Sequence, residues 1–132
     1  LETLGVPVVG LACDEFPAFT VHSSGLPIPA CVNTVQQLAS YTRAHRALGR
    51  TGGILACIPV PLADSLDKNT IDKIIEESLA ATAKAGIVGP AVTPHVLGAI
   101  AAATSGTSVV ANLSLAENNA RVAAELAVQL RN

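Results

Sequence analysis

Short apolar runs alternate with longer amphipathic segments along this chain. Residues 4–11 and 52–58 are rich in Val, Ile and Leu and carry no charge, which predicts strands buried on both faces of a sheet. Residues 107–113 have the same character and predict a further strand. Residues 87–92 predict a short strand or an extended link.

Segments with apolar side chains at helical spacing lie between these runs, and capping residues or glycines mark most of their ends. The predicted helices begin near Asn33 or Thr34, Asn69 or Thr70, Thr93-Pro94, and Ser114 or Leu115, and they end near Leu48, Gly86, Gly106 and Leu130. This alternation predicts an α/β fold, a layered α-β-α sandwich around a mostly parallel or mixed sheet.

Composition excludes several classes of protein. Half of the 132 residues are hydrophobic and 14% are charged, which is not typical of a disordered chain. The net charge of −2 and the scarcity of aromatic residues argue against a nucleic-acid partner. No apolar run approaches the ~20 residues that a membrane span needs, so we expect no membrane association.

Residues 12–33 form the longest stretch without a regular hydrophobic pattern. Residues 27–29 should be extended because of their two prolines. Long loops in compact domains are often functional. Asp14 and Glu15 follow the first strand, but adjacent side chains of an extended chain point to opposite sides, which favours a turn-forming or solvated role. Residues 23–25 could hold a phosphate or sugar, although no glycine-rich phosphate motif is present.

The cysteines and histidines show no CxxC or HxxxH spacing, so we expect no metal site formed by this chain alone. We interpret the thiols as buried and reduced, as in a cytosolic protein, with a catalytic thiol as the alternative. The residues are Cys13, Cys31, Cys57, His22, His45 and His95.

Asparagines are the most informative polar residues near the C-terminus. Asn112 is expected at the end of strand 107–113, where its amide could match the edge of a pyrimidine or a peptide group. The alternative is that it only satisfies the strand end. On the predicted last helix, one stripe holds Leu115, Asn119, Val122, Leu126 and Leu130, with Asn118 at its edge.

Several motifs occur in a fixed order along nearly the whole chain: LETLGVPVVG followed by DEFPAF, then SSGLPIP, ALGRTGGIL, PVP, AVTPHVL and ANLSLAENNARVAAELA. In these motifs the chain resembles the C-terminal part of the pseudouridine-5′-phosphate glycosidases, the indigoidine synthase A-like family. The resemblance implies that residues 1–132 are the C-terminal portion of a single domain whose N-terminal portion is missing here.

The resemblance also implies a reaction. Enzymes of this family reversibly cleave the C–C glycosidic bond of pseudouridine 5′-phosphate to give uracil and ribose 5-phosphate. A lysine forms a Schiff base with the opened ribose, a glutamate transfers protons, and an aspartate helps to hold a divalent metal, usually manganese. The family forms homotrimers, and we expect a cytoplasmic protein.

The family's lysine, glutamate and metal-binding aspartate have no counterpart in this sequence and are expected upstream of Leu1. Lys68, Lys73 and Lys84 belong to a predicted polar helix and do not replace the lysine, so the segment alone should be inactive. Asn112 matches the asparagine that contacts uracil in the family. Asn118 and Asn119 match the following NNA, where a supporting role is expected. Ile58 departs from the family pattern, because many relatives carry asparagine there.

Two alternatives remain at the level of the sequence. The chain could be a catalytically inactive α/β assembly or regulatory module derived from the family. It could also be an unrelated small ligand-binding α/β domain, which the ordered motifs disfavour.

Overall fold

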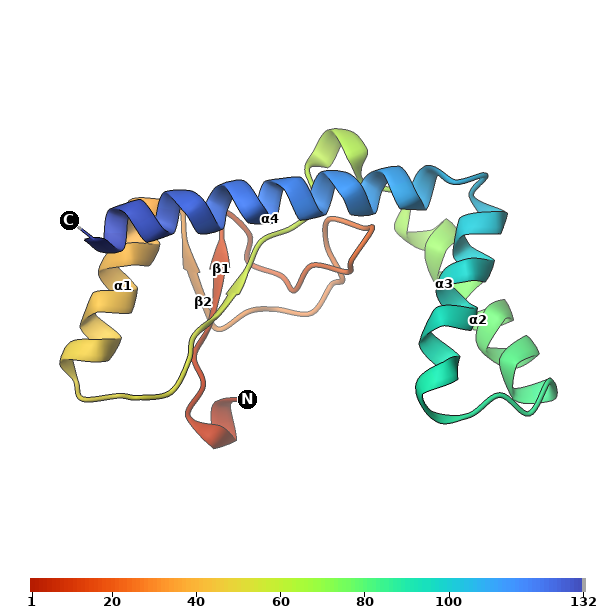
Figure 1. Cartoon of the computed structure of the whole chain (residues 1–132), viewed down its shortest axis with the longest axis horizontal. Coiled ribbons are helices and arrows are strands. Elements are labelled where there is room, and N and C mark those ends of the chain that lie inside the picture. The colour runs from red at the N-terminus through yellow and green to blue at the C-terminus, as the bar shows by residue number, and fades with distance from the viewer. Residues whose placement is uncertain (132) are drawn as a thin grey trace.

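The computed structural model describes residues 1–131. Three strands form a parallel sheet in the order β2-β1-β3 (Figure 1). The central strand is β1 (Val8–Leu11), and β2 (Ala30–Val32) and β3 (Leu55–Cys57) pair with it on either side. All residues of β1 are buried, as predicted for a strand that is covered on both faces. The α/β class with a parallel sheet is confirmed.

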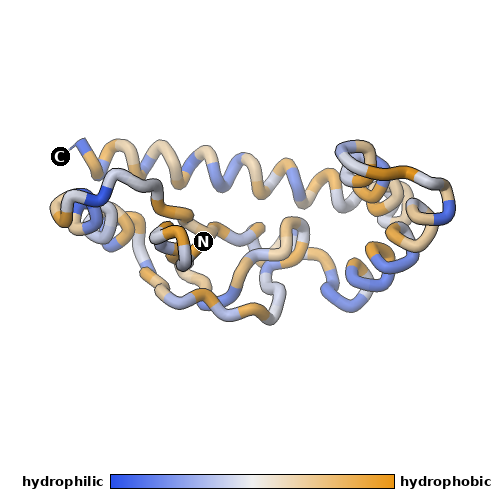
Figure 2. Tube along the Cα trace, turned by 90° about the horizontal axis from the view of Figure 1, so that it is seen from below, coloured by the Kyte–Doolittle hydropathy of each residue, from blue (hydrophilic) through white to orange (hydrophobic). Residues whose placement is uncertain are grey.

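The long helix α4 connects the two ends of the molecule. In Figure 1 the sheet and α1 lie at one end of α4, and the antiparallel pair of α2 and α3 lies at the other end. Figure 2 shows the same elongated arrangement from below, with α4 along one side. The helices are α1 (Val35–Ala47), α2 (Lys68–Lys84), α3 (Val92–Ala103) and α4 (Thr107–Arg131), and short 3-10 turns occupy Glu2–Leu4, Leu62–Asp64 and Gly89–Ala91.

The core has two separate centres. Val8, Ile28 and Cys57 pack on one face of the sheet, where the loop after β1 covers them with Cys13 and Phe16. Side chains alternate along a strand, so Val9 and Leu11 point to the opposite face, toward α1 and α4. A second cluster joins the same loop to α2 and α3 through Val21, Ile71 and Ile100. The loop 12–29 therefore packs against both ends of the molecule.

The expected strand 107–113 is wrong, because these residues form the first turns of α4. Gly106 has a positive φ of 84° and ends the turn from α3, and the helix starts directly after it. Ser108 and Ala111 are buried while Val109 and Val110 are exposed, which is a helical and not an alternating pattern. A short apolar run does not distinguish a strand from a helix by composition alone.

The sheet contains one strand that the sequence pattern hides. Strand β2 has only three residues and lies at the end of the irregular segment 12–33, directly after residues 27–29, which the prolines predict to be extended. The expected strands 4–11 and 52–58 are both shorter in the structure. Residues 87–92 form no strand, because a 3-10 turn with Pro90 leads directly into α3; Ala91, and not Thr93, is its N-cap.

No single helix within residues 1–131 is long and apolar enough to cross a membrane; the one combination that meets both criteria, 89–103 with 107–131, is bent by 115°.

Helix α2 begins at an aspartate cap rather than at the expected Asn69 or Thr70. The Asp67 carboxylate accepts hydrogen bonds from the backbone N–H of Thr70, at 2.8 Å, and from its hydroxyl, at 2.7 Å. Both bonds lower the pKa of Asp67 below its ordinary value of 3.8, and the bond from the Thr70 hydroxyl has the larger effect.

We expect the cap to stabilise the fold most when Asp67 is ionised. Because the folded pKa is depressed, this stabilisation is complete above the unfolded pKa and is lost as the pH falls through the folded value. Asp67→Ala should therefore lower Tm at neutral pH, and the difference from the parent chain should narrow below about pH 4. Thermal melts between pH 3 and pH 7 check this, and a difference that grows toward low pH contradicts it.

Candidate functional site

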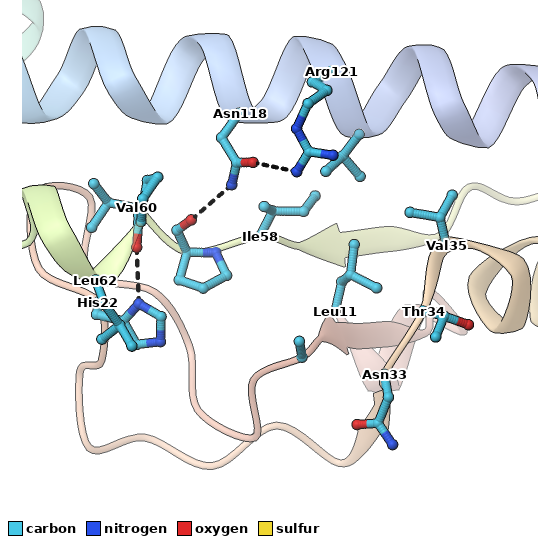
Figure 3. A pocket seen from close by; sticks show the side chains of 14 residues that line it. Leu11, His22, Asn33, Thr34, Val35, Ile58, Val60, Leu62, Asn118 and Arg121 are labelled. Carbon is cyan, nitrogen blue, oxygen red and sulfur yellow. Dashed lines mark hydrogen bonds between the residues drawn. The ribbon is translucent and has the colours of Figure 1, made fainter.

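A hollow of about 490 Å³ lies at the carboxyl ends of the three strands, the edge where open α/β sheets bind ligands (Figure 3). The residues that follow β1, β2 and β3 all contribute to it, and α4 closes one side. We call it the strand-end hollow. Its lining consists of Leu11, Ala12, His22, Asn33, Thr34, Val35, Ile58, Pro59, Val60, Pro61, Leu62, Asn118, Arg121 and Val122.

The backbone at the end of β1 is strained where it enters this hollow. Ala12 has a φ of 54°, a conformation that side chains rarely adopt, and its N–H donates to the carbonyl of Val32 at 2.7 Å. The hydrogen bond ties the ends of β1 and β2 together. Strain of this kind persists where the surrounding structure enforces it, and it often occurs at functional sites.

His22 presents one ring nitrogen as a potential acceptor in the strand-end hollow. Its Nδ1 lies 2.8 Å from the carbonyl oxygen of Val60, and its backbone N–H donates to the Ser65 hydroxyl at 2.9 Å. Because a carbonyl only accepts, the neutral ring carries its hydrogen on Nδ1. Nε2 is then free to accept a hydrogen bond from a ligand.

Asn118 links α4 to the loop after β3. Its Nδ2 donates to the buried carbonyl of Pro59 at 3.3 Å, and its Oδ1 accepts from Nη2 of Arg121 at 2.8 Å. Arg121 also donates through Nη1 to Glu125 at 2.7 Å. Both terminal nitrogens of Arg121 therefore have protein partners. The side chain supports the wall of the hollow and does not present an unpaired positive charge there.

Of the two neighbouring asparagines on α4, Asn118 is the less exposed, which is the reverse of the expectation. Asn118 faces the sheet and is half-buried, whereas Asn119 is exposed. The buried side chains Ala111 and Val122 mark the stripe on which Asn118 lies. The earlier start of the helix adds the buried residues Ser108 and Ala111, which fix the side of the stripe on which Asn118 lies.

Asn112 is on helix α4 and not at a strand end, so the expected location is wrong. It lines a second, smaller hollow of about 90 Å³ and does not reach the strand-end hollow. We call this the Asn112 hollow; its other lining residues are Phe19, Thr20, Leu97, Ile100, Ala101, Ser108 and Val109. Asn112 and Asn118 are six residues apart, which separates them by about 9 Å along the helix.

The Asn112 hollow combines apolar walls with a few polar groups. Phe19 exposes 47% of its surface and has a φ of 61°, so a strained backbone presents its ring at this hollow. Leu97 and Val109 supply further apolar surface from α3 and α4. An amide beside apolar walls can bind a flat polar ring. The role of Asn112 in base recognition stays a prediction.

The loop candidates are used within the loop. The Glu15 carboxylate accepts hydrogen bonds from the Ser23 hydroxyl and, at 2.9 Å, from the N–H of Gly25. Asp14 is exposed. Ser23 and Glu15 therefore stabilise one turn, as the turn-forming interpretation expected, whereas Asp14 is solvated.

Metal-ligating side chains do not cluster within residues 1–131. In the part of the chain that the structure describes, no three His, Cys, Asp or Glu side chains lie close enough to bind one ion. Lys68 forms an exposed ion pair with Asp72 on α2. That the metal aspartate and the reactive lysine lie upstream of Leu1 stays a prediction.

Sequence reasoning missed most of the strand-end hollow. The signal was available in the rule that ligands gather at the carboxyl ends of parallel strands, since Ala12 follows one expected strand and Ile58 is the last residue of another. Asn33 was expected only as a helix cap, because β2 was not predicted, and Arg121 lies outside the predicted apolar stripe of the last helix.

Comparison with known proteins identifies the family. Residues 1–129 match the model of the indigoidine synthase A-like proteins. The chain is 46% identical to a pseudouridine-5′-phosphate glycosidase of Methylobacterium nodulans over 99% of its length, and 45% identical to that of Gemmatimonas aurantiaca over 98%. It covers only 39% and 42% of those two relatives, so the chain spans about two fifths of their length.

Two solved structures share the fold. One is the prealnumycin C-glycosynthase AlnA in complex with ribulose 5-phosphate, with a TM-score of 0.90, 35% identity, and coverage of 98% of this chain and 43% of that one. The other is an indigoidine synthase A-like protein of Thermotoga maritima, with a TM-score of 0.84, 28% identity, and coverage of 100% and 43%. With the family model matching nearly every residue, the chain belongs to the indigoidine synthase A-like family.

Proposed function

We propose that this chain is the nucleobase-recognising part of a pseudouridine-5′-phosphate glycosidase. The observation that carries the proposal is the identity of 46% to a protein of that name over 99% of the chain. A complex of AlnA with ribulose 5-phosphate supports a sugar phosphate as the class of substrate. The Asn112 hollow, with its amide and apolar walls, is suited to the uracil ring.

The proposed reaction breaks the bond between C5 of uracil and C1 of ribose 5-phosphate. A lysine outside these residues would form an iminium at C1 of the opened sugar, which draws the electrons needed for cleavage. In the proposal Asn112 holds the uracil through its amide donor and acceptor, so that C5 stays aligned for proton transfer. Manganese and a trimeric assembly remain proposals from the family, and no step here depends on either.

A chimera tests the proposal. The matching two fifths of the Methylobacterium nodulans relative are replaced by these 132 residues, and uracil release from pseudouridine 5′-phosphate is measured with and without manganese. We expect the chimera to release uracil and the 132-residue chain alone to release none. Trapping with borohydride should add the sugar phosphate covalently to the chimera only.

Two outcomes contradict this. Uracil release by the 132-residue chain alone would place the reactive amine within it. A chimera that melts cooperatively and traps the sugar phosphate but releases no uracil would favour an assembly or regulatory module.

A further inference from the structure

The three thiols lie close together on one face of the sheet. Gly10 of β1 is the direct partner of Cys31 on one side and of Cys57 on the other. Paired residues on parallel strands point to the same face, at a strand spacing of about 4.8 Å. The loop after β1 brings Cys13 back over Gly10. The Sγ of Cys13 lies 3.1 Å from the point that a Cβ of Gly10 would occupy. The loop therefore places one sulfur above the row of the other two.

Cys13 contacts Cys57. Its Sγ donates a hydrogen bond to the Cys57 carbonyl at 3.5 Å, and its side chain packs against the cluster to which Cys57 belongs. Cys57 is buried, Cys13 is half-buried and Cys31 is exposed, so the expectation that all three are buried is wrong. All three are free thiols.

We propose that Cys13 and Cys57 form a reversible disulfide when the protein meets a disulfide oxidant such as glutathione disulfide. The Cys13 thiolate attacks one glutathione sulfur, forms a mixed disulfide and releases one glutathione. The Cys57 thiolate then attacks Sγ of Cys13 and releases the second glutathione. Two protein thiols are oxidised and one glutathione disulfide is reduced to two thiols.

The bond would join two strand ends that line the strand-end hollow. Cys13 follows Leu11 and Ala12, and Cys57 precedes Ile58. Leu11, Ala12 and Ile58 line the strand-end hollow. Closure would fix the ends of β1 and β3 to each other across 44 residues of sequence. A ligand that needs these ends to move would then bind more weakly to the oxidised protein.

Slow exchange at neutral pH follows from the surroundings of the thiols. Burial, and then the neighbouring thiols of Cys57 and Cys31, raise the pKa of Cys13, as does the Asp14 carboxylate, while a hydrogen bond from the backbone of Leu11 lowers it. Burial also raises the pKa of Cys57. Only the thiolate attacks a disulfide, so closure should accelerate as the pH rises above neutral.

The test uses the 132-residue chain carrying Cys31→Ser, which removes the exposed thiol. After treatment with glutathione disulfide, we expect the mass to fall by two hydrogens with no glutathione attached, and peptide mapping to link Cys13 to Cys57. The oxidised chain should melt at a higher temperature, and a thiol reductant should reverse both changes. The matched control, Cys31→Ser with Cys57→Ser, should stop at one glutathione adduct on Cys13.

Three results would overturn the proposal. The first is a stable glutathione adduct on Cys13 while Cys57 is present. The second is a folded Cys31→Ser chain in which both thiols are still free after oxidation at high pH. The third is a disulfide between Cys13 and Cys31 in the parent chain. A thiol count in denaturant confirms that both sulfurs were reduced at the start.

Discussion

Gly10→Ala is expected to abolish the native fold or to destabilise it by more than about 3 kcal/mol. A Cβ at this position would lie 1.9 Å from the carbonyl oxygen of Cys13 and 3.0 Å from its carbonyl carbon. Both are backbone atoms, so no side-chain rotation relieves the clash. Gly10 is buried in the central strand, which is paired on both sides and cannot shift without breaking a ladder.

Urea denaturation of Gly10→Ala beside Gly53→Ala measures this effect. Gly53 lies just before β3, has no positive φ, and a Cβ there meets nothing within 4 Å. Its replacement should change the free energy of unfolding by less than about 1 kcal/mol. If Gly10→Ala unfolds at the same urea concentration as the parent chain, the close approach of Cys13 to β1 is wrong.

The fold class follows from the sequence, whereas the boundaries of its elements depend on contacts that lie far apart along the chain. Val8–Leu11 is apolar on both faces, and that pattern predicts a covered central strand correctly. Ala30–Val32 is a strand only because β1 offers an open edge beside it, and three residues carry too little pattern to show this. The start of α4 at Thr107 depends on the turn at Ser105 and Gly106, which the β-branched run after it obscured.

The candidate site was predictable to a similar extent. The position of ligands after parallel strands is general, and Ala12 and Ile58 obey it. The partners of Asn118, by contrast, follow from the packing of α4 across the loop after β3, which no local pattern contains. Asn112 was singled out by its amide at an expected strand end and by resemblance. Only the structure shows that its hollow also contains Phe19, almost a hundred residues earlier in the chain.

Asn112→Ala in the chimera is expected to lower kcat/KM for pseudouridine 5′-phosphate by about 10- to 100-fold. An amide that both donates to and accepts from the uracil edge contributes two hydrogen bonds, together worth about 1–3 kcal/mol, and tenfold corresponds to about 1.4 kcal/mol. Asn112 is exposed on α4, so its truncation should leave Tm nearly unchanged. Steady-state kinetics and a thermal melt of the same preparation separate loss of recognition from loss of stability.

Asn119→Ala is the matched control for this prediction. Asn119 is an exposed asparagine of the same helix and lines neither the strand-end hollow nor the Asn112 hollow. Its variant should keep the parent kcat/KM, because no contact to a base is lost. Borohydride trapping of ribose 5-phosphate alone should proceed equally in both variants, since that step involves no uracil. An Asn112→Ala chimera with unchanged kcat/KM would remove the assignment and direct the search for the base to the strand-end hollow, where His22 and Asn33 are the nearest alternatives.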